Sequence, residues 1–102
     1  MSAEFALRRE EVEDLCHRFQ VRRLELFGSA ADGRFSAVSS DLDFLVEFSP
    51  LAAGAYADCY FGLREALEEL FGLPVDLVVD SAIRNPYFRQ AVERSKVLMY
   101  AA

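Results

Sequence analysis

Two aspartates separated by a single residue, Asp41 and Asp43, are the first pattern in this sequence that could do chemistry. Residues two apart on a β-strand point to the same face, so both carboxylates would leave the sheet together while Leu42 and Phe44 enter the core. Carboxylates about 5 Å apart repel by roughly 3 kcal/mol at an effective dielectric of about 20, and a shared divalent cation would convert that repulsion into attraction. Oxygen ligands without a nearby His or Cys favour Mg²⁺ or Mn²⁺ over Zn²⁺. We therefore predict that Asp41 and Asp43 bind such a metal ion.

A third carboxylate, Asp76, stands in a short β-branched segment where it alternates with Val75, Leu77 and Val79. If this segment forms a strand beside the Asp41–Asp43 strand, the three carboxylates converge. Two cations held there could bind the phosphates of a nucleotide and polarise an incoming hydroxyl, with Asp76 as a ligand or as the general base. The three aspartates therefore indicate phosphoryl or nucleotidyl transfer.

Gly28 and Ser29 directly follow a predicted strand. A glycine lets the backbone approach a phosphate closely, and the N–H groups and the hydroxyl that follow can donate hydrogen bonds to it. Gly28 and Gly33 have the spacing of the two glycines of a P-loop. A P-loop requires Lys and then Ser or Thr after the second glycine, but this sequence has Arg34 and Phe35, which excludes a P-loop NTPase. We predict a phosphate-binding turn of another kind at Gly28 and Ser29.

The hydrophobic periodicities predict the elements that must position these residues. They are a helix over residues 3–19, strands over 23–27, 41–48 and 75–80, a helix over 56–71 capped by Gly72, a helix from Pro86 to about Arg94 opened by Asn85, and a closing strand over 97–100. Residues 30–40 are predicted to form a short helical turn and a loop. This order predicts an α/β (α+β) fold in which a small mixed sheet is covered by helices mainly on one face, leaving the other face for function or for a contact.

Composition limits the remaining possibilities. A chain of 102 residues is expected to form one domain, residues 1–102, and its 53% hydrophobic content is enough for a packed core. The net charge of −6 is the wrong sign for binding nucleic acid through its phosphates. Cys16, Cys59 and His17 lack the spacing of a disulfide framework or a zinc site. Without a signal core or a membrane-spanning apolar run, a reduced, cytoplasmic protein is expected.

The string LFGSAADGRFSAVSSDLDFLVEF resembles the G-S and D-x-D signature of the DNA polymerase beta-like nucleotidyltransferases, and within that superfamily the minimal nucleotidyltransferases are most similar. The VDLV segment around Asp76 matches the third carboxylate of that family. The resemblance implies a polymerase-beta-like fold, Gly28 and Ser29 at the triphosphate, Asp41 and Asp43 as metal ligands, and Asp76 completing the catalytic triad. It further implies Mg²⁺ and ATP.

Many members of this group are antitoxins of the MntA type, paired with an all-helical HEPN ribonuclease toxin that some of them adenylylate on tyrosine. The resemblance therefore implies a nucleotidyltransferase that adenylylates a HEPN-type partner as its antitoxin, in a homo- or hetero-oligomer. The family pattern G-S-x-A-R-G has an arginine where this sequence has Asp32, and a carboxylate beside a triphosphate weakens binding unless it faces solvent or Arg34 takes over.

Asp32 keeps open an alternative, a binding module that neutralises a toxin by contact with little or no catalysis. A small-molecule transferase is disfavoured, because the acceptor-binding half is absent. Tyr60 and Phe61 are neighbours on a predicted helix and cannot both face the core, so one of them could contact a partner. The basic residues near the C-terminus either form a solvated helix face or complement a triphosphate or an acidic partner.

Overall fold

Three α-helices and four strands form the part of the chain that the computed structural model describes, residues 8–28, 31 and 41–102. In chain order they are α2 (Arg9–Arg18), β1 (Val21–Phe27), β2 (Leu42–Phe48), α4 (Tyr56–Phe71), β3 (Val75–Val79), the 3₁₀ turn η1 (Asp80–Ala82), α5 (Pro86–Ser95) and β4 (Val97–Ala101). The predicted order of helices and strands is thereby confirmed, including the closing strand.

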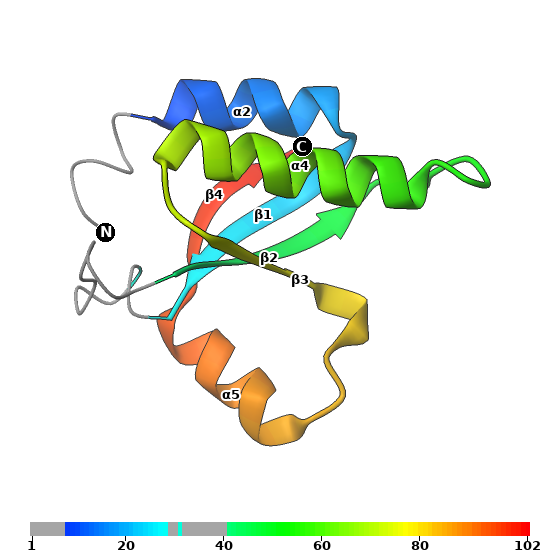
Figure 1. Cartoon of the computed structure of the whole chain (residues 1–102). Coiled ribbons are helices and arrows are strands. Elements are labelled where there is room, and N and C mark those ends of the chain that lie inside the picture. Colours follow the sequence, from blue (N-terminus) through cyan, green and yellow to red (C-terminus); the bar gives the residue numbers. More distant parts are fainter. Residues whose placement is uncertain (1–7, 29–30, 32–40) are drawn as a thin grey trace.

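The strands form one mixed sheet in the order β3-β2-β1-β4. Strand β1 pairs antiparallel with both β2 and β4, whereas β2 and β3 run parallel. Parallel neighbours need a crossover connection, and α4 supplies it. Figure 1 shows α2 and α4 packed together on one face of the sheet and α5 on the other. The predicted mixed sheet, covered mainly on one face, is confirmed.

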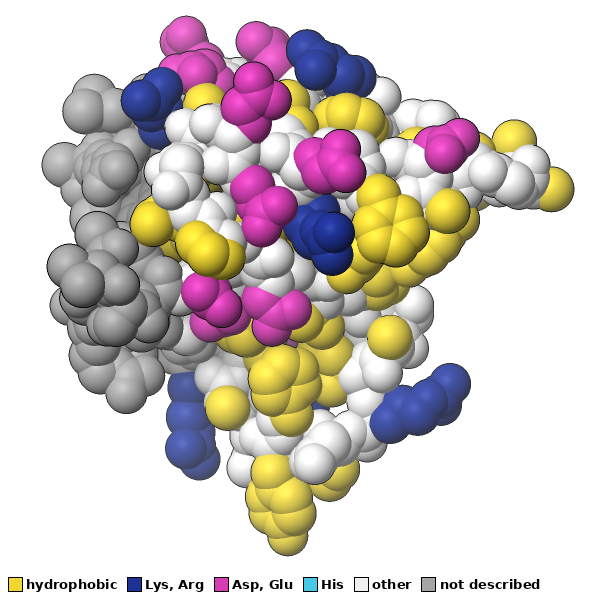
Figure 2. Space-filling view, viewed as in Figure 1, with side chains coloured by type: hydrophobic (Ala, Val, Ile, Leu, Met, Phe, Trp, Pro, Cys, Tyr) yellow, Lys and Arg dark blue, Asp and Glu magenta, His cyan; other side chains and the backbone are white. Residues whose placement is uncertain are grey.

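The main core lies between the sheet and the α2–α4 layer. Each helix contributes an apolar stripe, and each strand of the sheet contributes the residues that point to this face. The fully buried side chains of this core include Val12, Cys16, Leu24, Leu26, Leu42, Phe44, Leu63 and Leu67. The outer surfaces of α2 and α4 carry many acidic side chains, visible in Figure 2. Among the described helices, none has the length and apolar character that crossing a membrane requires.

A smaller apolar cluster lies on the second face of the sheet, under α5. It consists of Phe27, Leu45 and Val92, with Val78 and Ile83 packed against it. Val92 is the buried residue of α5. Apolar packing therefore holds α5 to the sheet at a single buried position.

A chain of ion pairs also links α5 to the sheet. Glu25, a buried residue of β1, lies 3.4 Å from Arg23 and 3.5 Å from Lys96. Lys96 is 2.9 Å from Glu93, which lies 3.9 Å from Arg89, and Arg89 pairs with Asp80 in η1. The alternating charges thus run from β1 along α5 to the turn after β3.

Both predicted helix caps are confirmed. Gly72 ends α4 in a left-handed conformation, with φ of 68°. The Asn85 side chain accepts hydrogen bonds from the N–H groups of Tyr87 and Phe88, at 2.8 and 3.3 Å, and Pro86 opens α5. The left-handed glycine ends α4, and the side-chain cap of Asn85 followed by Pro86 begins α5. Both signals are local and can be recognised in the sequence.

Several predicted boundaries differ from those observed. The first helix begins at Arg9 rather than at residue 3, with Arg8 as its N-cap, and the predicted residues 3–7 lie outside the described residues. Strand β1 begins at Val21 rather than at residue 23, because Val21 pairs with Phe48 across an irregular register. Strand β2 begins at Leu42, so Asp41 precedes it, and Asp80 lies in η1 rather than in β3. The predicted turn and loop over residues 30–40 falls outside the described residues except for Ala31, which is buried.

Candidate active site

Asp43 and Asp76 lie side by side near the beginning of two parallel strands. They are Cα partners in the register of β2 and β3. Their strand neighbours Leu42, Phe44 and Leu77 are buried in the main core, so the two carboxylates point to the second face. The predicted convergence of these strands is confirmed. Asp41, exposed, directly precedes β2 at the same edge.

The electrostatics of Asp43 reflect this crowding. Burial first, then the charges of Asp76 and of Asp41, raise the pKa of Asp43 from 3.8 to about 6. A raised pKa of this origin means that the negative charges at the site lack compensation. The donor set consists of hard carboxylate oxygens that repel one another, which fits a divalent cation of the Mg²⁺ type.

Gly28 forms the turn that directly follows β1, and it lies against Asp43. Its φ of +73° is in the left-handed region, and a Cβ at this position would lie 2.6 Å from Asp43 Oδ2. The Gly28 N–H donates to Ser95 Oγ at 3.0 Å, and its carbonyl accepts from the Ala31 N–H at 3.1 Å. Only a glycine fits here, since any side chain would meet the carboxylate.

The structure thus brings together Gly28, Asp43 and Asp76, with Asp41 near enough to act on the pKa of Asp43. Ser29 lies outside the described residues, as do Asp32 and Arg34. Among the residues that are described, no group of three or more His, Cys, Asp or Glu side chains has the arrangement of a preformed metal site. Metal binding by Asp41, Asp43 and Asp76 stays a prediction.

A cavity of about 440 Å³ opens beside Gly28, between α5 and the end of β1. Phe27, Phe88 and Val92 give it apolar walls, and Arg94 and Ser95 line the part contributed by the last turn of α5. The Cα partner of Phe27 in β2 is Asp43, so this cavity adjoins the carboxylates. Its volume is within the usual range for small-molecule sites.

Sequence reasoning did not identify Ser95 or Phe88 as part of this region. No local motif marks either residue, because each reaches Gly28 or Phe27 only through the packing of α5 on the sheet. The hydrophobic spacing of α5 could have indicated that Phe88 and Val92 share a helix face.

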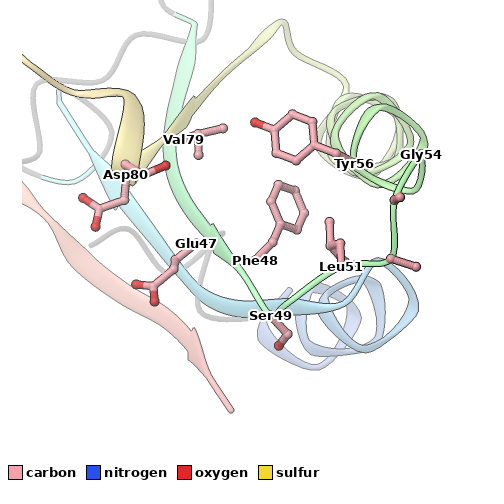
Figure 3. Close-up of a pocket in the computed structure, with 11 residues that line it drawn as sticks. Glu47, Phe48, Ser49, Leu51, Gly54, Tyr56, Val79 and Asp80 are labelled. Atoms are coloured by element: carbon pink, nitrogen blue, oxygen red, sulfur yellow. The ribbon is translucent and has the colours of Figure 1, made fainter.

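A larger cavity, of about 710 Å³, lies near the other end of β2 and β3. In Figure 3, Phe48, Leu51 and Tyr56 extend into it, whereas the carboxylates of Glu47 and Asp80 point away from these three side chains. Strands advance about 3.3 Å per residue, so the five positions from Asp43 to Phe48 span roughly 16 Å. Size alone would favour this cavity, but the carboxylates and Gly28 mark the other end as the candidate active site.

Residues 8–99 match the family model of the nucleotidyltransferase domain. A Methanocaldococcus jannaschii protein whose name contains the words "protein adenylyltransferase" is 34% identical over 89 residues, covering 87% of each chain. The protein adenylyltransferase MntA of Thermococcus cleftensis is 37% identical over 73 residues, which is 72% of this chain and 70% of that protein.

Solved structures agree with these relatives. A structure described as a "minimal nucleotidyltransferase" is 37% identical, with a TM-score of 0.72, over 90% of this chain and 89% of the other. A Shewanella oneidensis structure, a tri-AMPylated HEPN toxin in complex with an MNT antitoxin, matches 96% of this chain and 73% of the other at 17% identity, with a TM-score of 0.65, and shows the shared fold. The family model matches almost the whole chain, and two relatives are more than 30% identical to it. The chain therefore belongs to the nucleotidyltransferase domain family.

Proposed function

We propose that this chain uses Mg²⁺ and ATP to adenylylate a hydroxyl group of a protein partner. The observation that carries the proposal is the pairing of Asp43 with Asp76 in register, on two parallel strands, directly beside the glycine turn at Gly28. Nucleotidyl transfer needs negative ligands for a cation and a close backbone approach to phosphate at the same place.

Each residue has a distinct role in this proposal. Asp41, Asp43 and Asp76 would hold one or two Mg²⁺ ions, which supply positive charge to the phosphate oxygens when bound. Gly28 and Ser29 would bind the triphosphate through backbone N–H groups and the hydroxyl. The acceptor oxygen forms a bond to the α-phosphorus, the bond to the β-phosphate oxygen breaks, and pyrophosphate leaves. The proton of the acceptor passes to a carboxylate, for which Asp76, exposed at the sheet edge, is the candidate.

The partner in this proposal is a helical HEPN-type toxin, with this chain as its antitoxin and a tyrosine as the acceptor. Support comes from the two relatives described above, whose names both include "protein adenylyltransferase", and from the S. oneidensis complex of an AMPylated HEPN toxin with an MNT antitoxin. The net charge of −6 supports a protein acceptor over nucleic acid, and the complex would act in the cytoplasm.

The test is transfer of label from α-labelled ATP to a purified HEPN-type helical protein, in the presence of Mg²⁺. Wild-type protein is compared with Asp43→Asn and Asp76→Asn, which keep side-chain shape and remove charge. Asp58→Asn, an exposed position in the first turn of α4, is the matched control. We expect the two site variants to lose transfer by at least about a hundredfold, the control to match wild type, and a chelator to abolish labelling.

Equal labelling by wild type and by Asp43→Asn would refute the assigned carboxylate role. Absence of label for every nucleoside triphosphate, together with full neutralisation of the toxin by both site variants, would instead establish the binding module that acts by contact alone.

A further inference from the structure

Arg94, in the last turn of α5, lines the 440 Å³ cavity beside Gly28. We propose that its guanidinium binds the phosphate chain of the nucleotide, an inference that rests on the proposed function and adds a residue to it. Gly28 lies against Asp43 and also contacts α5 through Ser95, so a nucleotide at this turn would be near both.

Gly28 fixes this geometry. A Cβ on its Asp43 side would lie 2.6 Å from a carboxylate oxygen, and its N–H donates to Ser95 Oγ at 3.0 Å. Arg94 is the residue next to Ser95, and it lines the same cavity as Gly28. A phosphate chain lying along the turn would therefore have the Asp43 carboxylate near one end and Arg94, at the rim of the cavity, near the other.

The charges of the neighbouring cations are already engaged. Arg89 pairs with Asp80 and with Glu93, and Lys96 pairs with Glu93 and with Glu25. Within residues 8–28, 31 and 41–102, by contrast, no ion pair involves Arg94. Arg94 is exposed and lines the same cavity as Gly28, and a guanidinium that has no ion-pair partner among the described residues is suited to bidentate binding of phosphate.

The charge of the site also favours such a cation. Asp43 and Asp76 are Cα partners, and Asp41 is close enough to raise the pKa of Asp43. A triphosphate brings further negative charge to this region, so a cation on the α5 side of the turn would add to the positive charge that Mg²⁺ supplies at the carboxylates. Arg94 supplies it from α5, far from the turn in sequence.

Equilibrium binding of ATP, ADP and adenosine to the full chain tests this role without relying on turnover. The variants are Arg94→Gln and Arg94→Lys, and the matched control is Arg84→Gln, an exposed arginine that does not line the cavity. We expect Arg94→Gln to weaken ATP binding about ten- to a hundredfold, ADP binding less, and adenosine binding by less than about twofold. Arg94→Lys should retain part of the affinity because it keeps the charge, and Arg84→Gln should bind like wild type.

Unchanged ATP affinity in Arg94→Gln, or an equal loss for ATP and adenosine in a variant with wild-type unfolding behaviour, would overturn the role of Arg94. The transfer assay separates this failure from that of the proposed function. Wild-type protein that labels its partner while Arg94→Gln binds ATP normally refutes Arg94 alone. Wild-type protein that binds ATP and labels nothing refutes the transfer proposal while the affinity comparison still decides on Arg94. If the wild type does not bind ATP, both proposals are refuted.

Discussion

Gly28 and Asp43 are so close that residue 28 cannot carry a side chain: an ideal Cβ there would lie 2.6 Å from Asp43 Oδ2. The two residues belong to adjacent strand ends, because the residue before Gly28, Phe27, is the Cα partner of Asp43. The turn that would bind phosphate is thus in direct contact with a carboxylate that would bind metal. A side chain added at residue 28 would therefore displace the Asp43 carboxylate.

Gly28→Ala is expected to lower the free energy of unfolding by about 1–2 kcal/mol, from backbone strain at positive φ plus the contact, and to reduce nucleotidyl transfer at least about tenfold. Chemical unfolding and the labelling assay measure both. Gly54→Ala is the matched control, since Gly54 has φ of +84° but nothing within 4 Å of its Cβ position. The control should share the strain and keep full transfer. Equal transfer by the two variants would show that the contact with Asp43 is unimportant.

Asp43→Asn is expected to stabilise the metal-free protein in a pH-dependent way. The pKa of Asp43 is about 6 in the folded state and 3.8 in the reference state, so the folded state binds more protons between these values. In the wild type, the contribution of protonated Asp43 to the free energy of unfolding is therefore complete below about pH 4, and it is lost as the pH rises through about 6. The variant should exceed wild type by about 1 kcal/mol at pH 7, after allowance for solvent screening, and by nothing near pH 3.

Thermal unfolding of both proteins from pH 3 to 8 in the presence of a chelator measures this difference. A gap that stays constant across the range would contradict the raised pKa. Added Mg²⁺ should reverse the order at pH 7, because the cation stabilises the carboxylate form alone.

Ser95→Ala removes the acceptor of the Gly28 N–H and should cost about 1 kcal/mol of stability, with a several-fold rise in KM for ATP and a smaller effect on kcat. Ser95→Thr keeps a hydroxyl and should restore most of the KM. Steady-state kinetics measure this effect. The control is Ser81→Ala, which changes an exposed serine of η1. A change in stability with no change in KM would leave Ser95 a purely structural residue.

Tyr60→Phe should destabilise the fold by about 0.5–1.5 kcal/mol without affecting transfer, since the Tyr60 hydroxyl donates to the Leu77 carbonyl and so ties α4 to β3. Phe61 faces outward with 49% exposure and lies under the guanidinium of Arg64, so Phe61→Ala should change stability less. Denaturant titration of both variants measures their free energies of unfolding and shows whether Tyr60→Phe is the more destabilising change. A loss of transfer in Tyr60→Phe would indicate that the hydrogen bond between α4 and β3 also affects the candidate active site.

Local patterns were sufficient to predict much of this architecture. The alternation around Asp43 and Asp76 correctly predicted two strands with carboxylates on one face, and Gly72 and Asn85 marked helix ends through chemistry confined to a few residues. The tie between Gly28 and Ser95 could not be predicted, because it spans 67 residues and depends on how α5 lies on the sheet. For the same reason, the sequence alone could not distinguish Arg94 from the other basic residues near the C-terminus.

The attachment of α5 has a consequence for local opening. Val92 is the buried residue of α5, and the other links of this helix are ion pairs, the contact of Phe88 with Phe27 and the hydrogen bond of Ser95 with Gly28. We therefore expect α5 to exchange its amide hydrogens faster than α2 and α4, which cover the main core. Opening of α5 removes Phe88, Arg94 and Ser95 from the cavity at once. A nucleotide that needs the closed arrangement would therefore slow exchange in α5 selectively, so that occupancy of the site could be measured from the protection of a helix that carries none of the three aspartates.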